Sequence, residues 1–559
     1  MPQMQSFFGG ADTQRSTNLA DNRLINLYPT TNDKGDVTAF VSTPGFYQWS
    51  TATGTLPASG MYTTTNGRFF VTTGTSLYEI DALNNKTLRG TITSSLHYEM
   101  SDNGNELILV NGIDGWIFTF ATNTLKKIKV FESTMTVTIA SPAVVTTASA
   151  HGLVAGDRVI LSSTGALPSG LTTAQVYYVI SAGLGATTMQ LSLTSSGAAI
   201  NTSGVQSGVH TLDSDGYGFP NGATTVSYLN GRFICIEIGT QNFFCSEVLD
   251  GKYWDALNVQ TADSNPDEAE ASIVSHNELI VLCEFSGEVF YDSGTIPSPF
   301  TRNVSGVFEV GTSAPFSLAK IDNSIMWLGQ STTGGNIIYR LNGYTPSRIS
   351  TYSIEYALNQ MTTTADAQAF AYQQEGHHFY VITFPTGNKT FVYDANTQLW
   401  HERAAWDSVA GTFNRWAANH YAFFNGMHLI SDYASNAILS LDLDTYEDNG
   451  YVHKWLRSWR CNSSDMKRQL HHKLTLEAEM GVANDSSTAN GKHPDVMMRY
   501  SKDGSHTWSS ELWRSLGEIG EYTKRVFWHR LGMTTGQPRI YEISGTAPVK
   551  ITLLGAYLE

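Results

Sequence analysis

The sequence predicts an all-β protein, on three grounds. Charged residues make up 15% of the chain against 41% hydrophobic and 11% aromatic residues, whereas about 25% charged residues is usual in soluble domains. The chain also contains 49 glycines and 26 tyrosines, a composition that favours strands and tight turns over helices. Finally, short apolar runs bounded by small polar turns recur along most of the chain, and this pattern is typical of β-hairpins.

A hairpin pattern recurs seven times. Each copy has a small polar turn, a short apolar strand, a second turn and a second strand; the copies begin at Asn66, Asn103, Asn230, His276, Asp322, Glu375 and Asn425. Successive markers in these turns (Gly67, Gly104, Gly231, Asn277, Asn323, Gly376, Gly426) are 37, 127, 46, 46, 53 and 50 residues apart. Removing the unusual Thr134–Leu212 segment reduces the one long gap to a length like the others.

A repeat of about 40 to 50 residues with four short strands is typical of a β-propeller, because each blade exposes an apolar face that only its neighbours cover. We therefore expect six or seven blades. A series of β-sandwiches also produces strands at short spacing, but the hairpin keeps its order within each repeat, which favours the propeller.

The 559 residues are too many for one core of ordinary size. We predict an N-terminal arm and first strands in residues 1–60, propeller blades in 61–133 and 213–450, an inserted small β-domain in 134–212, and a C-terminal β-domain in 451–559. The inserted segment is rich in Thr, Ser, Ala and Gly, and after Tyr451 the composition shifts towards Trp, Arg and His.

The charge disfavours tight, sequence-specific DNA binding. The chain has 34 Lys and Arg against 50 Asp and Glu, a net charge of −16, and such a surface repels phosphate on average. The N-terminus lacks a basic start followed by an apolar stretch, and no window approaches 18 apolar residues. We expect assembly in the cytoplasm without membrane insertion.

The four cysteines are expected to be buried, reduced thiols. Cys235, Cys245, Cys283 and Cys461 lie mostly in apolar, strand-like contexts without the spacing of metal ligands. The two histidine doublets, His377–His378 and His471–His472, do not form a chelating pair, because adjacent residues on a strand point to opposite faces.

Ser501, Asp503, Thr507 and Trp508 match much of the Asp-box pattern of sialidase-type propellers, in which Asp and Ser close a hairpin turn and Trp packs beneath it. Ser505 stands where that motif usually has glycine. An Asp side chain that accepts backbone N–H bonds stabilises such a turn. We interpret the four residues as a structural device.

No catalytic, cofactor or metal site is predicted. A glycosidase needs two carboxylates facing each other, and nothing singles out a pair among Asp267, Glu268, Glu270 and Asp444. The sequence has no P-loop, nucleophile elbow, HExxH motif or zinc-spaced cysteine pair. We therefore expect a protein that is not an enzyme.

Trp455, Arg457 and Trp459 alternate along one predicted strand and so share a face. The two tryptophan rings on that face could stack on single-stranded nucleic acid or sugar. Alternatively, they fill a hydrophobic core and the arginine side chain packs beside them. We favour the core.

Several segments resemble the podovirus tail hub, or nozzle, family of packaged-DNA stabilisation proteins. The run NRLINLYPTTNDKGDVTAFVSTPGF looks like the family's opening, and YSKDGSHTWSSELWRSLGEIGEYTKRVFWHRLG looks like its closing domain. GVFEVGTSAPFSLAKIDNSIMWLG and FVYDANTQLWHER are similar to its blades. The residues that carry the opening are Asn26, Tyr28, Pro29, Thr43, Pro44 and Gly45, and the 134–212 insertion departs from the family pattern.

The resemblance implies a structural role in the virion tail. It implies a homo-hexamer beneath the portal and its head-to-tail adaptor, which extends the DNA channel, retains the packaged genome and offers attachment to tail fibres, spikes or a needle. Double-stranded DNA would pass without sequence-specific binding, since few cations mean few phosphate contacts to break. Two alternatives stay open: a propeller that binds or cleaves carbohydrate, and a host propeller scaffold unrelated to viruses.

Overall fold

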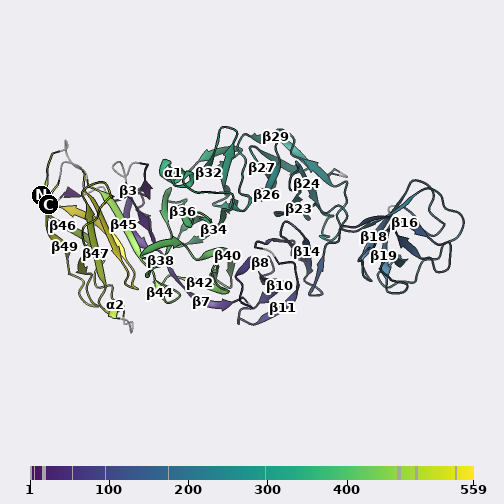
Figure 1. Ribbon diagram of the computed structural model, residues 1–559, viewed down its shortest axis with the longest axis horizontal. Coiled ribbons are helices and arrows are strands. Elements are labelled where there is room, and N and C mark those ends of the chain that lie inside the picture. Colours follow the sequence, from purple (N-terminus) through teal and green to yellow (C-terminus); the bar gives the residue numbers. More distant parts are fainter. Residues whose placement is uncertain are drawn as a thin grey trace.

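The computed structural model describes the whole chain except residues 1, 2, 5, 6, 16–20, 53, 95, 174, 296, 297, 462–466, 485–488 and 535–537. The molecule is elongated, and three parts follow one another along its long axis (Figure 1). A β-sandwich with both chain termini lies at one end, a β-propeller lies in the middle, and a small barrel projects at the other end. In the described residues the helices are short: α1 (Tyr352–Asn359), α2 (Ala489–Lys492) and the 3₁₀ turn η1 (Pro315–Ser317).

The propeller has seven blades in the part of the chain that the structure describes, each with four antiparallel strands. The first six blades are meanders of consecutive strands. Blades one to three are β8 (Ala58–Thr63), β9 (Phe69–Thr73), β10 (Ser76–Ile80) and β11 (Lys86–Thr91); β12 (Glu99–Asp102), β13 (Glu106–Val110), β14 (Gly115–Thr119) and β15 (Thr124–Lys127); β22 (Val226–Leu229), β23 (Arg232–Ile236), β24 (Asn242–Cys245) and β25 (Val259–Thr261).

Blades four to six follow directly. They are β26 (Ala269–Ser275), β27 (Glu278–Cys283), β28 (Gly287–Asp292) and β29 (Phe300–Phe308); β30 (Ala319–Ile321), β31 (Ser324–Ser331), β32 (Gly334–Asn342) and β33 (Thr345–Arg348); β34 (Gln368–Gln374), β35 (His377–Phe384), β36 (Lys389–Asp394) and β37 (Leu399–Glu402). The seven hairpins predicted from the sequence form the two middle strands of the seven blades, which confirms the propeller.

The seventh blade joins the two ends of the propeller. Its strands are β40 (Ala418–Phe424), β41 (Met427–Asp432), β42 (Ala437–Asp442) and, from the N-terminal side, β7 (Gly45–Thr51). Phe46 pairs with Leu441 across this closure. The rings of Phe69 in the first blade and Phe424 in the seventh stack 5.2 Å apart, so apolar packing between first and last blades completes the ring.

The turns that enter the predicted hairpins need left-handed backbone. In the last five blades both residues of the two-residue turn have positive φ, as at Asn230 (48°) and Gly231 (88°). This is the geometry of a type I′ turn, whose twist matches that of the paired strands. Asn and Gly tolerate it best, which explains the turn composition that reveals the repeat.

The inserted domain is a closed six-stranded barrel between the second and third blades. Its strands, in order around the barrel, are β16 (Glu132–Val137), β17 (Val145–Thr147), β20 (Thr188–Ser192), β19 (Val176–Ile180), β18 (Arg158–Ser163) and β21 (His210–Ser214). Val159, Leu161, Val179, Met189 and Leu212 form its core. Alternate residues of each strand point inward, which explains the alternating apolar pattern of this segment.

The C-terminal domain is a two-sheet sandwich that includes the N-terminal segment. One sheet contains β49 (Val526–Met533), β46 (Leu470–Ala478), β51 (Thr552–Leu558), β6 (Val37–Ser42), β5 (Leu27–Thr31) and β1 (Gln3–Met4). The other contains β4 (Leu24–Ile25), β45 (Trp455–Arg460), β50 (Ile540–Gly545), β47 (Asp495–Ser501) and β48 (Leu512–Ser515), and it continues into the sixth blade through the parallel pair of β4 and β37. The expected N-terminal arm thus crosses the sandwich before the chain reaches its first blade. Phe7 and Leu24 are buried in the sandwich core beside Trp459.

Short strand pairs complete the fold at the boundary between sandwich and propeller. They are β2 (Asp12–Thr13) with β3 (Asp21–Asn22), β38 (Ala404–Asp407) with β39 (Thr412–Arg415), and β43 (Glu447–Asp448) with β44 (Tyr451–Val452). The last pair extends the sheet of the seventh blade, because β43 lies parallel to β7. Within the ranges that the structure describes, no helix has the length and apolar character needed to cross a membrane.

Candidate functional site

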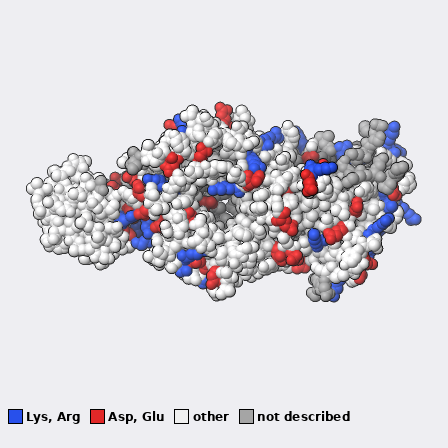
Figure 2. Space-filling view, turned by 180° about the vertical axis from the view of Figure 1, so that it is seen from behind, with Lys and Arg blue, Asp and Glu red and all other residues white. Residues whose placement is uncertain are grey.

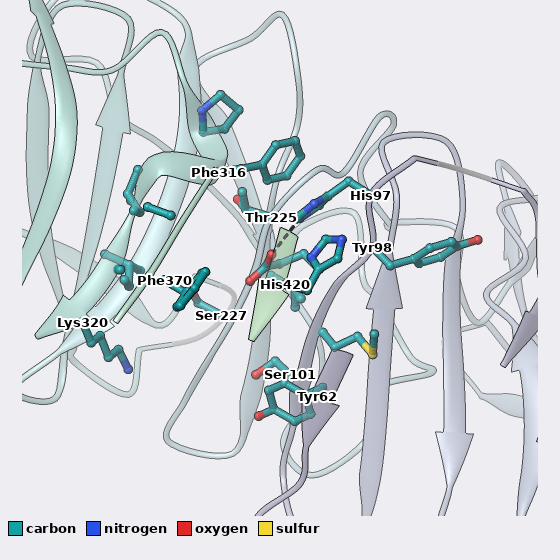
Figure 3. A pocket seen from close by; sticks show the side chains of 18 of the residues that line it. Tyr62, His97, Tyr98, Ser101, Thr225, Ser227, Phe316, Lys320, Phe370 and His420 are labelled. Carbon is teal, nitrogen blue, oxygen red and sulfur yellow. Dashed lines mark hydrogen bonds and ion pairs between the residues drawn. The ribbon is translucent and has the colours of Figure 1, made fainter. Parts of the chain in front are cut away.

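The innermost strands of the blades converge on an axial cavity of about 520 Å³. Residues from different blades face one another across it, among them Tyr62 on β8, Ser101 on β12, Ser227 on β22, Lys320 on β30 and His420 on β40 (Figure 3). The cavity therefore exists only when the ring of blades is closed. The space-filling view shows the propeller hollowed near its centre (Figure 2).

Two histidines and an aromatic ring form one wall of the cavity. His97 lies with its ring centroid 3.8 Å from that of Phe316 and 5.1 Å from that of His420. Its Nε2 lies 3.2 Å from Oε2 of Glu99. Burial, assisted by the nearby His97, holds the pKa of His420 well below its usual value, so this ring is neutral at physiological pH.

The carboxylates of the cavity are already engaged by protein groups. Asp102 accepts hydrogen bonds from the Tyr62 hydroxyl at 3.0 Å and from the Thr65 backbone N–H at 3.2 Å, while Glu99 lies against His97. Acid–base cleavage of a glycoside needs one carboxyl group as acid and a second as nucleophile or base. Glu99 and Asp102 are instead held as parts of the wall.

The cavity is too small for a DNA duplex. A volume of about 520 Å³ corresponds to a sphere roughly 10 Å across, whereas the major groove of a duplex is by itself about 12 Å wide. A duplex therefore does not thread a single propeller.

The Asp-box-like residues form a hydrogen-bonded turn after β47. Ser501 donates its hydroxyl to Asp503 at 2.7 Å, and Asp503 accepts the Thr507 backbone N–H at 2.9 Å and the Thr507 hydroxyl at 2.6 Å. The bonds from Thr507, helped by Ser501, lower the pKa of Asp503 to about 2. These contacts support the structural role that we propose for the turn.

Two features of this turn differ from the motif. Trp508 is half-buried and lies under the Arg499 guanidinium, whose carbon is 4.6 Å from the ring centroid. Ser505, where glycine is usual, has a positive φ of 70° and donates its hydroxyl to Asp21. This contact attaches the turn to the N-terminal segment.

The face with Trp455, Arg457 and Trp459 lies in the sandwich core. All three side chains are buried, which excludes stacking on nucleic acid or sugar. Arg457 donates through Nε to the Phe7 carbonyl at 3.0 Å and through Nη1 to the Arg23 carbonyl at 3.4 Å. Burial lowers its pKa to about 9.

The histidine doublets are split as expected on strands. His377 contacts the buried Asp394 through Nδ1 at 2.8 Å, whereas His378 lies 3.0 Å from the Asn396 amide oxygen. His471 is buried against the Tyr541 hydroxyl while His472 is exposed. Among the described residues no cluster of three or more His, Cys, Asp or Glu is arranged to hold a metal ion.

The remaining candidates have structural environments. The Asp267 carboxylate accepts the Phe285 backbone N–H at 2.8 Å and the Ser286 hydroxyl at 3.0 Å, which closes a turn. The four cysteines are free and buried, and burial raises the pKa of Cys461 to about 11. A thiol with such a pKa is a poor nucleophile at neutral pH.

Charge is distributed unevenly along the molecule. Residues 454–559 contain 15 Lys and Arg against 11 Asp and Glu, whereas residues 1–453 contain 19 against 39. Acidic side chains are spread over the propeller face in Figure 2, basic ones gather at the sandwich end, and the barrel is almost uncharged. The propeller thus carries the negative charge found in the sequence.

Asn26 joins three parts of the chain, a role that the sequence did not reveal. Its side-chain amide donates to the carbonyls of Ala404 and Lys454, both at 2.8 Å, and its oxygen accepts the Ala404 N–H at 3.0 Å. Asn26 itself has a positive φ of 53°. A single asparagine in a Leu-Ile-Asn-Leu run predicts nothing of these partners, which are distant in sequence.

The chain is similar to several solved structures at low sequence identity. The N-terminal domain of Nup159 is 7% identical, with 75% of this chain and 98% of that chain covered and a TM-score of 0.35. Kluyveromyces lactis Hsv2 is 9% identical over 65% of this chain and 98% of its own, with a TM-score of 0.25. An exo-β-1,3-galactanase from Phanerochaete chrysosporium is 10% identical over 70% and 94%, with a TM-score of 0.23. No curated protein matches the sequence significantly.

Two family models match the chain in the order of its domains. The model described as "Bacteriophage P22 Gp10, beta-propeller" matches residues 173–446, and the model described as "Bacteriophage P22 Gp10, beta-sandwich" matches residues 454–559. Together they span well over half of the chain. The first matches part of the barrel and the blades that follow it, and the second matches the sandwich. The chain therefore belongs to the bacteriophage P22 Gp10 family and is a structural protein of a phage tail.

Proposed function

We propose that this protein is the hub, or nozzle, of a short-tailed phage, and that six copies form a ring around the DNA channel below the portal and its adaptor. The ring retains the packaged genome and provides attachment for tail fibres, spikes or a needle. It assembles in the host cytoplasm. The protein acts mechanically and has no catalytic role.

The observation that carries the proposal is the match of both a propeller and a sandwich model of one phage protein, in that order, on a single chain. The size of the axial cavity supports a ring, because a duplex does not fit one propeller. A channel then has to lie between copies. Closed cyclic rings are a common way to enclose such a space.

The charge supports a conduit that does not hold DNA tightly. A protein that neutralises many phosphates releases counterions and binds strongly. Residues 1–453 carry 39 acidic against 19 basic side chains, so contact between the propellers and phosphate is disfavoured. Retention of DNA in this proposal comes from closing the passage, and ejection is not slowed by adhesion.

The test combines the mass of the assembly with the fate of the genome. The full-length chain, purified with the adaptor, is expected to give a six-copy mass. Phage produced without this chain are expected to package DNA and then lose it, and the wild-type gene supplied in trans is expected to restore DNA retention. Chains that stay monomeric beside the adaptor, or particles that keep their DNA without this chain, would overturn the proposal.

A further inference from the structure

The barrel surface is almost free of charge. From Ser133 to Leu212 the sequence contains only two charged side chains, Asp157 and Arg158. Figure 2 shows this lobe as an uninterrupted uncharged surface beyond its base. Surfaces designed for solubility contain roughly 25–35% charged residues. The exposed part of the barrel consists mainly of Thr, Ser, Gly, Ala and aliphatic side chains, with the neutral amides of Gln175, Asn201 and Gln206 among them.

The two charges are used to fix the barrel to the propeller. Arg158 donates to Asp250 of the third blade at 2.5 Å and to Asp215, just after the last barrel strand, at 3.2 Å. Asp157 pairs with Lys129 at 3.2 Å and with Lys126 of the second blade at 3.6 Å. These pairs span both neighbouring blades and hold the barrel in one orientation at the tip of the molecule (Figure 1).

A groove of about 640 Å³ crosses the uncharged face. Thr136 and Thr146 line it from β16 and β17, and Gln206 lines it from the segment before β21. Gln206 donates its amide to the Val137 carbonyl at 2.9 Å, which holds this segment against β16. Val205 and Val209 in this segment are 86% and 56% exposed.

We propose that this face, defined by the groove together with Val205 and Val209, is the surface on which the barrel of a neighbouring copy of this chain docks. The inference rests on the proposed ring and adds to it the contact that the inserted domain makes. A cyclic ring places every barrel at the same level, so each barrel has an identical uncharged barrel in the copy on either side.

The charges favour a second copy over other occupants. Nucleic acid and anionic lipid surfaces are recognised by clustered Lys and Arg, and this face has none. Two copies that each carry a net charge of −16 repel one another through their charged surfaces. Contact between barrels avoids that repulsion, and it buries no ion, so no charge is desolvated.

The barrel is large enough for such an interface. A folded unit of its size exposes roughly 4,000 Å², and a specific interface takes about 800 Å² from each partner. One side of the barrel can therefore contact the preceding copy while another side contacts the following one, as a head-to-tail ring requires.

The first experiment places a charge on the proposed face. The variants are Val205→Glu and Val209→Glu in the full-length chain. In analytical ultracentrifugation, each variant assembly should dissociate at a protein concentration at least tenfold higher than that at which the wild-type assembly dissociates. The matched control is Val409→Glu, at a 97% exposed valine in the loop between β38 and β39, and it should dissociate like the wild type. If both barrel variants also dissociate like the wild type, the barrel contact is wrong.

A second experiment identifies the neighbour directly. A photo-crosslinking amino acid, p-benzoylphenylalanine, at position 205 in assembled tails should give cross-links to residues 134–212 of another copy. Cross-links to a different tail protein or to a host glycan would overturn the inference while leaving the hub function intact. Tails that do not contain this chain at all would instead contradict the proposed function.

Discussion

Arg158 of the barrel donates its Nη1–H to Asp250 of the third blade at 2.5 Å, and the same guanidinium reaches Asp215 through Nε at 3.2 Å. One side chain thus ties the inserted domain, its return segment and a propeller blade together. The barrel enters and leaves the propeller through two adjacent segments, so its orientation depends on contacts of this kind.

Arg158→Gln should loosen the barrel without unfolding it. The substitution leaves Asp215 and Asp250 near each other without their shared cation, and hydrogen bonds to charged groups contribute about 1.5–3 kcal/mol. We expect faster hydrogen exchange in residues 128–132 and 214–218 and a wider spread of dimensions in small-angle scattering. The control is Arg340→Gln, which removes the Arg340–Asp322 ion pair at 2.9 Å in the fifth blade. If both variants loosen the barrel equally, Arg158 does not hold the barrel in place.

The barrel should become more stable as the pH falls from about 7 to about 5. Burial, with Glu132 and Asp255 nearby, raises the pKa of Asp213 to about 6, against about 3.9 in an unfolded chain. The native state therefore binds more protons over this interval, and stability is lost as the pH rises through the folded pKa. Thermal melting followed by calorimetry from pH 5 to 7 measures this slope.

Asp213→Asn should flatten that slope and raise the melting temperature at pH 7, because the amide needs no proton to stay neutral. The matched control is Asp33→Asn, at an exposed turn residue of the N-terminal segment, which should leave the slope as in the wild type. An unchanged slope in Asp213→Asn would show that another group carries the pH dependence.

Arg457→Ala should release the N-terminal segment from the sandwich. The Phe7 carbonyl then loses its donor inside the core and a cavity is left, at a cost of about 3 kcal/mol. Hydrogen exchange should rise first around residues 7–13. Arg457→Lys keeps the charge but not the planar fork that donates through two nitrogens, so partial loss is expected. Arg525→Ala, at an exposed arginine, is the control; if its effect equals that of Arg457→Ala, the anchoring role is excluded.

Gly45→Ala should open the closure of the propeller. A Cβ at position 45 would lie 2.4 Å from the Glu447 carbonyl oxygen and 2.7 Å from its nitrogen, both backbone atoms that cannot yield easily. Overpacking of this kind costs about 1–3 kcal/mol, visible as a lower midpoint in urea. The control is Gly334→Ala, because a Cβ at position 334 meets open space, and it should change the urea midpoint little. If the midpoint of Gly45→Ala equals that of Gly334→Ala, β7 shifts freely and the closure is not strained.

Much of the propeller was predictable from local patterns. Turns such as Asn230–Gly231 need left-handed backbone, and the strands after them are short and apolar, so the repeat is visible in the residue types themselves. The barrel was predictable as a separate β-domain for a similar reason, since its composition differs from that of the blades and its strands alternate. The Asp-box-like turn at Ser501 and Asp503 was visible as a local motif, but its contact with Asp21 was not.

The sequence by itself determined the all-β class, the repeated hairpins and the negative charge, because these depend on residue type and on spacing within a few residues. Only the tertiary structure decided that β7 completes the last blade, that Phe7 and Leu24 fill the core of the C-terminal sandwich, and that the inserted barrel projects with its few charges at its base. Those features are pairings between segments up to hundreds of residues apart. No local pattern encodes such partners, since many exposed strand edges and apolar faces are chemically alike and only the packed whole selects among them.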